Sequence, residues 1–580
     1  MSYFEAEDKV PVQQTSIGIP SENGLTYNST QTIEISVPAT TKFFNPKESV
    51  LQFNVNIAPP TSASGVTRLQ LDAEIGAQIL IKDIRIWDGT HNTLLEEITD
   101  YNTMVAMKYD YETNQSLRNK RALTEGATIQ TPSGRGTRGS TETQLNSFTE
   151  NPYFTPRTAD PDVTAWTSAN WLSAKVDLPL HTGIFQNDRI FPLLLTNGLH
   201  ISITLETDNR VFRNMDGVSS NRRATLNPIF HSINGCATTG AIAGGDTTST
   251  WFFAVENNQQ ATNKNCPFVV GEPFNLVKLS DGSAATWVAT TANPIISRIE
   301  YDTSTTPNLI KVTSTLTKEL DTGGPITTNG AWSYYSTAVS DSTTFNPTYT
   351  VSNVELILAQ VSVDPRYEAG MVSRMKEGGI ITYDFLSATN YRHSQLVSDR
   401  VANIRLPLNN ARAKSIICVP TDASVYTSKQ NIDSEDTYLL TTANNRDWQN
   451  YSCRSGMVGL SDNITNYNFL YDGRLQPSRL VSLSKTSSKV SISQQALIEN
   501  DKALTSAGIN THSMRNFSNN FVIGRSLSLG SGVYDARNKD FNLQVNYQET
   551  NGPTKAHLWK CYCFHIRRLN IRGDSISVEV

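Results

Sequence analysis

Apolar and polar residues alternate along many short stretches of the chain, which is the period of a β-strand with one face on a core. The clearest cases are Ile33–Val37, Leu51–Ile57 and Leu199–Glu206. Similar runs recur to the C-terminus, separated by Pro, Gly and clusters of Ser, Thr, Asn and Asp that favour turns. The pattern predicts an all-β protein built from β-sandwiches.

Only a few segments have helical spacing. In Tyr101–Tyr111 the apolar residues fall on one helical face, and Asp100 is a candidate N-cap. A second helix is expected near residues 494–507, where Ser491 and Gln494 have the spacing of a capping box and Gly508 supplies a C-terminal stop. We therefore expect each half of the chain to contain about eight strands and one helix.

The chain has 580 residues, and single hydrophobic cores stop growing near roughly 250–300 residues. Two large domains are the natural expectation. The predicted division is an N-terminal arm at 1–30, a first sandwich at 31–365 with insertions at about 112–170 and 207–350, a linker at 366–378 and a second sandwich at 379–580. The insertion at 207–350 is too long for a simple loop and should contain short strands of its own.

Composition narrows the function. Charged residues make up 18% of the chain and the net charge is −5, so the basic arm that a direct nucleic-acid coat needs is missing. We find no basic-then-apolar leader and no run of 18 apolar residues, which predicts neither secretion nor a membrane span. A reducing compartment of synthesis is therefore expected. The cysteines are too few for a disulfide scaffold: Cys236, Cys266, Cys418, Cys453, Cys561 and Cys563.

Two C-terminal clusters suggest chemistry at first sight. Cys561, Cys563 and His565 would share one face of a strand, as a soft-metal site requires, but packed small hydrophobes beside a histidine explain them better. The tripeptide Arg572–Asp574 resembles integrin-binding loops, and a turn between strands explains its Gly and Asp. Ser575 follows a Gly-Asp pair but has no downstream base, which nucleophilic catalysis requires.

Paired carboxylates occur at Glu96–Glu97 and within Asp433–Asp436, where exposed charge is the expected explanation. The sequence thus predicts no catalytic residue, no cofactor-binding residue and no metal ligand. We expect a protein that is not an enzyme.

Several longer stretches resemble one protein family. The chain is similar to the double jelly-roll major capsid proteins of Polinton-like viruses and virophages, within the lineage of adenovirus hexons and the capsid proteins of tailless phages. The resemblance covers the chain from about residue 31 onward, except the two insertions. It is carried by residues 176–206, 351–371, 404–422, 521–547 and 559–573.

The resemblance implies two consecutive eight-stranded jelly rolls with long loop insertions and a few short helices. It implies a homotrimeric, pseudo-hexagonal capsomer that tiles the icosahedral shell of a double-stranded DNA virus, with the insertions as towers. Expected partners are neighbouring capsomers, a penton protein and other minor capsid proteins, with no sequence-specific nucleic-acid binding. The expected location is the virion, after assembly inside the host cell, and a membrane beneath the shell is left open.

Two other functions fit an all-β chain of this size. A carbohydrate-binding adhesin or lectin is the main alternative, although the missing leader and scattered cysteines weigh against it. A sandwich-fold glycosidase is the other, and the lack of a catalytic constellation weighs weakly against that.

Overall fold

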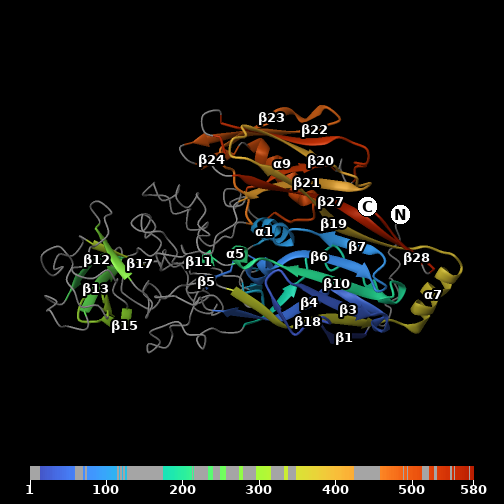
Figure 1. The fold of residues 1–580 in the computed structure, drawn as a ribbon, viewed down its shortest axis with the longest axis horizontal. Coiled ribbons are helices and arrows are strands. Elements are labelled where there is room, and N and C mark those ends of the chain that lie inside the picture. The colour runs from blue at the N-terminus through green and yellow to red at the C-terminus, as the bar shows by residue number, and fades with distance from the viewer. Residues whose placement is uncertain are drawn as a thin grey trace, which may run out of the picture.

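The fold was obtained as a computed structural model of the whole chain (Figure 1). It describes residues 13–58, 69–71, 75–113, 117, 120–121, 124–126, 174–211, 213–214, 233–238, 249–255, 274–278, 296–314, 332–336, 348–423, 457–486, 489–492, 494–511, 521–527, 532–548, 552–553, 556–573 and 575–580.

The first half forms two facing antiparallel sheets. One sheet has the order β1-β18-β4-β8 and the other β3-β10-β6-β7. Counted along the chain, the first, eighth, third and sixth strands make one sheet, and the second, seventh, fourth and fifth make the other. These strands are β1 (Gln13–Pro20), β3 (Thr32–Pro38), β4 (Phe43–Ala58), β6 (Ile81–Asp88), β7 (Leu94–Ile98), β8 (Ala174–Pro179), β10 (Gly198–Leu205) and β18 (Thr348–Ser362).

The second half repeats this order. Its sheets are β19-β27-β21-β25 and β20-β26-β22-β23, again the first, eighth, third and sixth strands facing the second, seventh, fourth and fifth. This strand order, found twice, is that of a jelly roll, and the predicted double jelly roll is confirmed. The strands are β19 (Ile381–Gln395), β20 (Val401–Leu406), β21 (Ala413–Asp422), β22 (Ile464–Tyr471), β23 (Arg474–Thr486), β25 (Ile523–Ser526), β26 (Phe541–Tyr547) and β27 (His557–Arg572).

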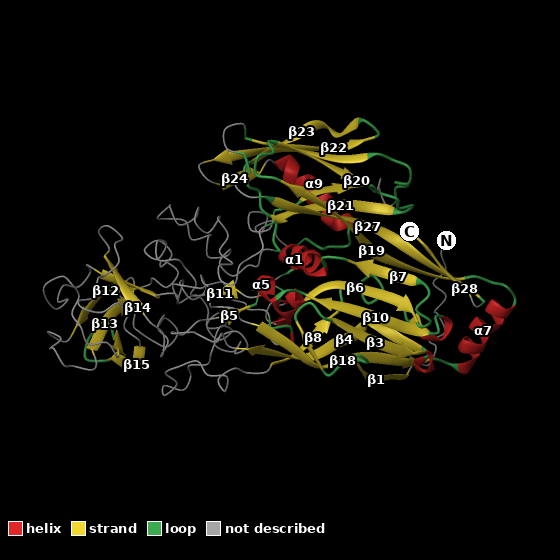
Figure 2. Ribbon diagram, viewed as in Figure 1, coloured by secondary structure: helices red, strands yellow, loops and turns green. Residues whose placement is uncertain are grey.

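Shorter elements extend the two sandwiches (Figure 2). Strand β2 pairs with β18, β9 with β4, β24 with β23 and β28 with β27. The bounds are β2 (Thr26–Asn28), β9 (Phe191–Pro192), β24 (Lys489–Ile492), β28 (Ser575–Glu579), the 3₁₀ turns η1 (Ala39–Thr41), η2 (Gly76–Leu80) and η4 (Leu193–Leu195), and the short helix α5 (Asp208–Val211).

The sequence alternation places the core as expected. Ile33, Ile35 and Val37 on β3 are at most 1% exposed, and Ile35 lies directly opposite Ile201 on β10. Fully burying one such side chain stabilises the fold by about 1.5–3 kcal/mol relative to leaving it in water. The intervening polar residues are only partly buried, so a shift of one residue in register would move the apolar set off the core.

A helix lies between the fifth and sixth strands of each sandwich: α1 (Tyr101–Glu112) in the first and α9 (Gln494–Ser506) in the second. Both were predicted, but their caps differ from expectation. Asp100 makes no side-chain cap, because its carboxylate binds residues of the other sandwich. Ser491 lies in β24, so it cannot cap α9. The C-terminal stop is confirmed, since Gly508 adopts φ +77°, where a residue without Cβ is favoured.

Both the predicted arm and the predicted linker contain regular secondary structure. The sequence assigned residues 1–30 to an arm, yet β1 and β2 within that range pair with β18. Strand β1 escaped detection because it is an edge strand whose residues are mostly exposed, so its alternation is weak. Helix α7 (Pro365–Lys376) follows β18 at the predicted linker, with Asp364 capping its start through the Arg366 amide.

Adjacent strands are antiparallel throughout. The first, third, fifth and seventh strands of each sandwich, counted along the chain, therefore run toward one end, and the second, fourth, sixth and eighth run toward the other. The four longest connections each follow a third, fifth or seventh strand, and they span 99–173, 206–347, 423–463 and 487–522. They therefore share one end, which we call the insertion end. Helix α7 lies at the opposite end (Figure 1).

The predicted insertion at 207–350 contains strands, as expected. They form small sheets beyond the insertion end of the first sandwich (Figure 1). The order in one sheet is β12-β13-β16-β15, while β14 pairs with β17 and β11 with β5. Their bounds are β5 (Leu69–Gln70), β11 (Arg213–Asn214), β12 (Ile233–Thr238), β13 (Ser249–Val255), β14 (Phe274–Lys278), β15 (Ile296–Asp302), β16 (Leu309–Ser314) and β17 (Trp332–Ser336).

Most of the insertion predicted at 112–170 lies outside the described residues. Across the described part of the chain, every helix is too short or too polar to cross a membrane.

Candidate functional site: the junction between the sandwiches

The two jelly rolls meet along β7 and the start of α1 on one side and strands β19 and β27 on the other (Figure 1). Lys560 and Tyr562 of β27 face the first sandwich, where they bond to Thr103 and Asp100. The first sandwich covers this face of the strand, because Tyr562 is fully buried and its hydroxyl donates to the Asp100 carbonyl oxygen at 2.8 Å.

Asp100 is the centre of the junction. Its side chain is 6% exposed, and its residue has φ +51°, a conformation that Asp tolerates better than most residues. The carboxylate accepts from Arg392 Nε at 2.6 Å and from Asn390 Nδ2 at 2.7 Å, both on β19. Lys560 Nζ of β27 lies 3.2 Å away. Burial alone would raise the pKa of Asp100, but Lys560 and Arg392 outweigh it and lower the pKa below its usual value.

Lys560 is the matching buried cation, 1% exposed. Besides Asp100 it donates to Thr103 Oγ1 at 2.7 Å, in the first turn of α1. Burial lowers the pKa of Lys560, and the Asp100 carboxylate opposes that shift. A buried ion pair is weak evidence for net stability, but removal of one partner leaves an uncompensated charge and is costly. The pair therefore fixes how the two sandwiches sit.

A second carboxylate, Glu96 of β7, joins three segments. It accepts from the Gly183 amide at 2.7 Å, the Ile184 amide at 3.0 Å and Ser387 Oγ of β19 at 2.7 Å. Burial raises the pKa of Glu96, and these three donors oppose the shift. Arg567 of β27 adds a bond from Nη1 to the Leu95 carbonyl oxygen at 2.7 Å. The Glu96 carboxylate therefore has three hydrogen-bond donors, and two of them lie outside its own strand in the first sandwich while the third lies in the second sandwich.

The backbones also approach closely. A Cβ on Gly183 would lie 2.2 Å from the Leu386 carbonyl oxygen of β19, which is far inside contact distance. Nearby, Asn187 Nδ2 donates to the Asp384 carbonyl oxygen at 2.8 Å and the Tyr383 hydroxyl donates to the Arg189 carbonyl oxygen at 3.0 Å. Contacts from the 183–189 turn to β19 therefore hold the α7 end of the junction.

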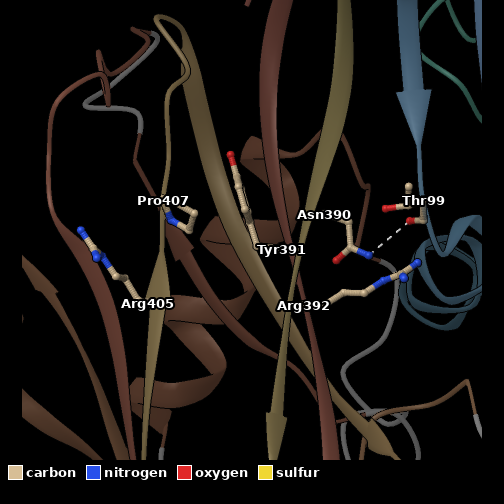
Figure 3. Close-up of a pocket in the computed structure, with 6 residues that line it drawn as sticks. All are labelled: Thr99, Asn390, Tyr391, Arg392, Arg405 and Pro407. Carbon is tan, nitrogen blue, oxygen red and sulfur yellow. Dashed lines mark hydrogen bonds between the residues drawn. The ribbon is translucent and has the colours of Figure 1, made fainter.

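A cavity of about 720 Å³ opens beside the junction (Figure 3). Asn390 and Arg392 point toward the first sandwich, while Tyr391 points to the other side of β19. Arg392 is committed to Asp100, and Arg405 lies 3.6 Å from Asp540 with 80% of its side chain exposed. The cavity lacks a converging acid and base among its lining residues, which are Thr99, Asn390, Tyr391, Arg392, Arg405 and Pro407.

A chain of titratable groups lies under α1. Lys108 Nζ is 3.3 Å from His181 Nδ1, His181 Nε2 is 2.6 Å from the Tyr109 hydroxyl, and that hydroxyl donates to Glu125 at 2.9 Å. An ammonium group cannot accept, so a protonated Lys108 makes Nδ1 the acceptor and leaves the proton on Nε2. Burial raises the pKa of Glu125 to about 7. The arrangement ties Glu125, at the root of the first insertion, to α1.

The residues that the sequence analysis weighed as chemical candidates are dispersed. Cys561, Cys563 and His565 are fully buried. Among the described residues no group of three or more His, Cys, Asp or Glu side chains is placed to hold a metal ion. Glu96 is buried in the junction, whereas Glu97 pairs with Arg85 near the surface, so the two carboxylates do not converge.

The remaining candidates give no site either. Arg572 and Gly573 form the turn between β27 and β28, with Gly573 at φ +56°. Asp574 and the Asp433–Asp436 run lie outside the described residues.

Sequence reasoning missed the residues that make the junction. Asp100 was interpreted as a helix cap, and Lys560 was passed over within the apolar run Trp559–Phe564. A lysine between apolar residues of a strand that is buried on both faces was the available signal, because such a cation needs a buried partner.

Comparison with known proteins gives remote structural likenesses. No family model and no curated protein sequence matches the chain. The PBCV-1 virus capsid shares 8% identity at TM-score 0.47, with both chains fully covered. The Sputnik virophage structure shares 9% at TM-score 0.44, covering 98% of this chain and 88% of that one, and the Faustovirus major capsid protein shares 10% at 0.43, covering 98% and 93%. Because these scores are below 0.5, the fold assignment depends on the strand order.

Proposed function

We propose that this chain is the major capsid protein of a double-stranded DNA virus, a trimeric pseudo-hexagonal tile of an icosahedral shell. The observation that carries the proposal is the pair of jelly rolls with identical strand order, joined by a buried polar junction. A rigid double-width block of this kind suits a shell tile, because its two barrels cannot change their mutual angle without exposing or unpairing Asp100 and Lys560.

The polarity of the block also supports a shell. The longest connections gather at the insertion end, and the opposite end has shorter connections, such as 180–197 and 527–540, and α7 (Figure 1). A tile needs one face that varies and another that stays uniform. In the proposed function the insertion end is the outer face, with residues 207–350 as the tower, and the α7 end faces the interior.

The proposal includes a division of the chain and a set of partners. The two sandwiches would be the structural units, with the linker at about 366–378 passing along the interior face. Partners would be two further copies in the trimer, adjacent capsomers, and penton and minor capsid proteins. The place of action would be the virion.

Size and shape of the purified protein test this function. We expect multi-angle light scattering to give about three times the 64.1 kDa mass of the chain, and negative-stain images to show pseudo-hexagonal particles with three towers. A stable monomer would contradict the proposal. Glycan binding by that monomer on an array would favour a lectin, and glycan cleavage would favour a glycosidase.

A further inference from the structure

Two buried thiols face each other in the centre of the second sandwich. Cys418 of β21 lies directly opposite Cys561 of β27 in the strand register, and both residues are 0% exposed. The two thiols are hydrogen-bond neighbours, and neither is part of a disulfide. They belong to adjacent central strands, so their positions are fixed by the sheet.

The register brings this pair within range of a bond. Residues directly opposite each other on antiparallel strands have Cα atoms about 4.5–5.5 Å apart, and disulfides span about 4.4–6.8 Å between Cα atoms. A bond between Cys418 and Cys561 therefore requires side-chain rotation without a shift in register. Cys563 is equally buried but lies opposite Ile416 on one side and Thr389 on the other. It therefore serves as an internal control, because it is as buried as the pair but has no cysteine opposite it.

We propose that Cys418 and Cys561 form a redox site that closes to a cross-strand disulfide on reaction with a small-molecule disulfide. One thiolate attacks a sulfur of the reagent, forms a mixed disulfide and releases one reagent thiolate. The second protein thiolate then attacks the mixed disulfide at the protein sulfur and releases the other. The protein loses two electrons, the reagent gains them, and the two thiol protons end on the released thiols at neutral pH.

Burial decides when the reaction occurs. It raises the pKa of Cys418 well above its usual value, and the hydrogen bond with Cys561 adds to this. Both thiols are fully buried and little Cys418 thiolate is present while β21 and β27 are closed, so exchange is slow in the native sheet. The thiols would stay reduced in a reducing compartment and become linked in an oxidising one.

The link would act as a lock. It would close a loop from residue 418 to residue 561, which contains six of the eight strands of the second sandwich at least in part. Cross-linking so long a loop restricts the unfolded chain strongly. We therefore expect the oxidised chain to resist unfolding better than the reduced one.

The test uses the full-length chain with C236S, C266S and C453S, which leaves three thiols. The protein is equilibrated at pH 8 in buffers of oxidised and reduced glutathione of increasing ratio, quenched with acid, alkylated under denaturing conditions and mapped by mass spectrometry. We expect Cys418 and Cys561 peptides to become linked, and Cys563 to stay alkylated. The thermal midpoint should rise with the linked fraction and return on reduction.

Single variants provide the controls. C563A should still form the link, whereas C418A should leave both remaining thiols free and its midpoint insensitive to glutathione. Wild-type chain is mapped in parallel, so the result does not depend on a variant that fails to fold. Three free thiols at every ratio would overturn the proposal, and so would a link that includes Cys563. Particle assembly is not measured, so the outcome is independent of the proposed function.

Discussion

Helices α1 and α9 occupy the same place in the strand order of their sandwiches, yet they contact different partners. At α9, Asn500 Oδ1 accepts from the Gly524 amide and Glu499 pairs with Arg525, both next to the helix in their own sandwich. At α1, Asn102 likewise donates to the Ile79 carbonyl oxygen and to Glu206 of its own sandwich, but the first turn also contacts Lys560 of the other sandwich. Both helices complete their own jelly roll, and α1 in addition binds the neighbouring one.

The junction is unequal for the same reason. The first sandwich contributes segments that lie between strands, namely the start of α1 and the 183–189 turn, together with β7. The second contributes the outer face of a regular sheet, on β19 and β27. A flat strand face can carry a lysine and an arginine at fixed spacing, while the turns can bring Asp100 and amide donors to meet them. The repeated fold thus acquires a defined side without a change in strand order.

The largest effect should come from removing the charge at the start of α1. Asp100→Asn keeps a residue that tolerates positive φ but leaves Lys560 buried without its counter-charge. We expect a loss of about 3–5 kcal/mol in the free energy of unfolding, measured by urea titration with tryptophan fluorescence.

Two controls sharpen this result. Glu97→Gln makes the same change three residues away in a half-exposed pair with Arg85, and should cost at most about 1 kcal/mol. The double variant Asp100→Asn with Lys560→Met should recover much of the loss, because no buried charge is left unpaired. If Asp100→Asn costs no more than Glu97→Gln, the junction does not depend on the charge of Asp100.

The next effect concerns the buried chain of titratable groups under α1, which joins Lys108, His181, Tyr109 and Glu125. Burial raises the pKa of Glu125 to about 7, against about 4.3 in an unfolded chain. Between those values the native state keeps a proton that the unfolded state has lost. Stability from this group is therefore fully present at acid pH and is lost as pH rises through about 7.

Glu125→Gln removes this titration. We expect the wild type to lose roughly 3 kcal/mol of unfolding free energy relative to the variant as the pH rises from 4.5 to 8. His181 contributes the opposite slope, because burial lowers its pKa, but it is present in both chains and cancels. A pH-independent difference would show that Glu125 titrates normally in the fold.

The sequence was sufficient for the fold and insufficient for the junction. Alternation in β3, β10 and β26 is a local signal of which face is buried, and the repeated arrangement of such runs indicated two sandwiches. Strand β1 gave no such signal, because it is an edge strand and most of its side chains are exposed.

The junction depends on pairing between residues that are hundreds of positions apart, and local patterns do not record it. Asp100 precedes a helix, so the local pattern predicted a cap. Its carboxylate instead binds two cations and an amide of the other sandwich and makes no bond to the helix backbone. The same holds for Glu96, whose neighbour Glu97 is chemically identical and sits on the opposite face of β7.

The smallest expected effect tests how closely the two sandwiches must approach. Gly183→Ala places a methyl group 2.2 Å from the Leu386 carbonyl oxygen, so the turn and β19 must separate, at a cost of about 1–3 kcal/mol. Gly370→Ala in α7 is the matched control, because nothing lies within 4 Å of its Cβ position. There the change should stabilise the protein by up to about 1 kcal/mol, since alanine favours the helix. If both variants unfold at the same urea concentration as the wild type, the contact between the 183–189 turn and β19 does not define the junction.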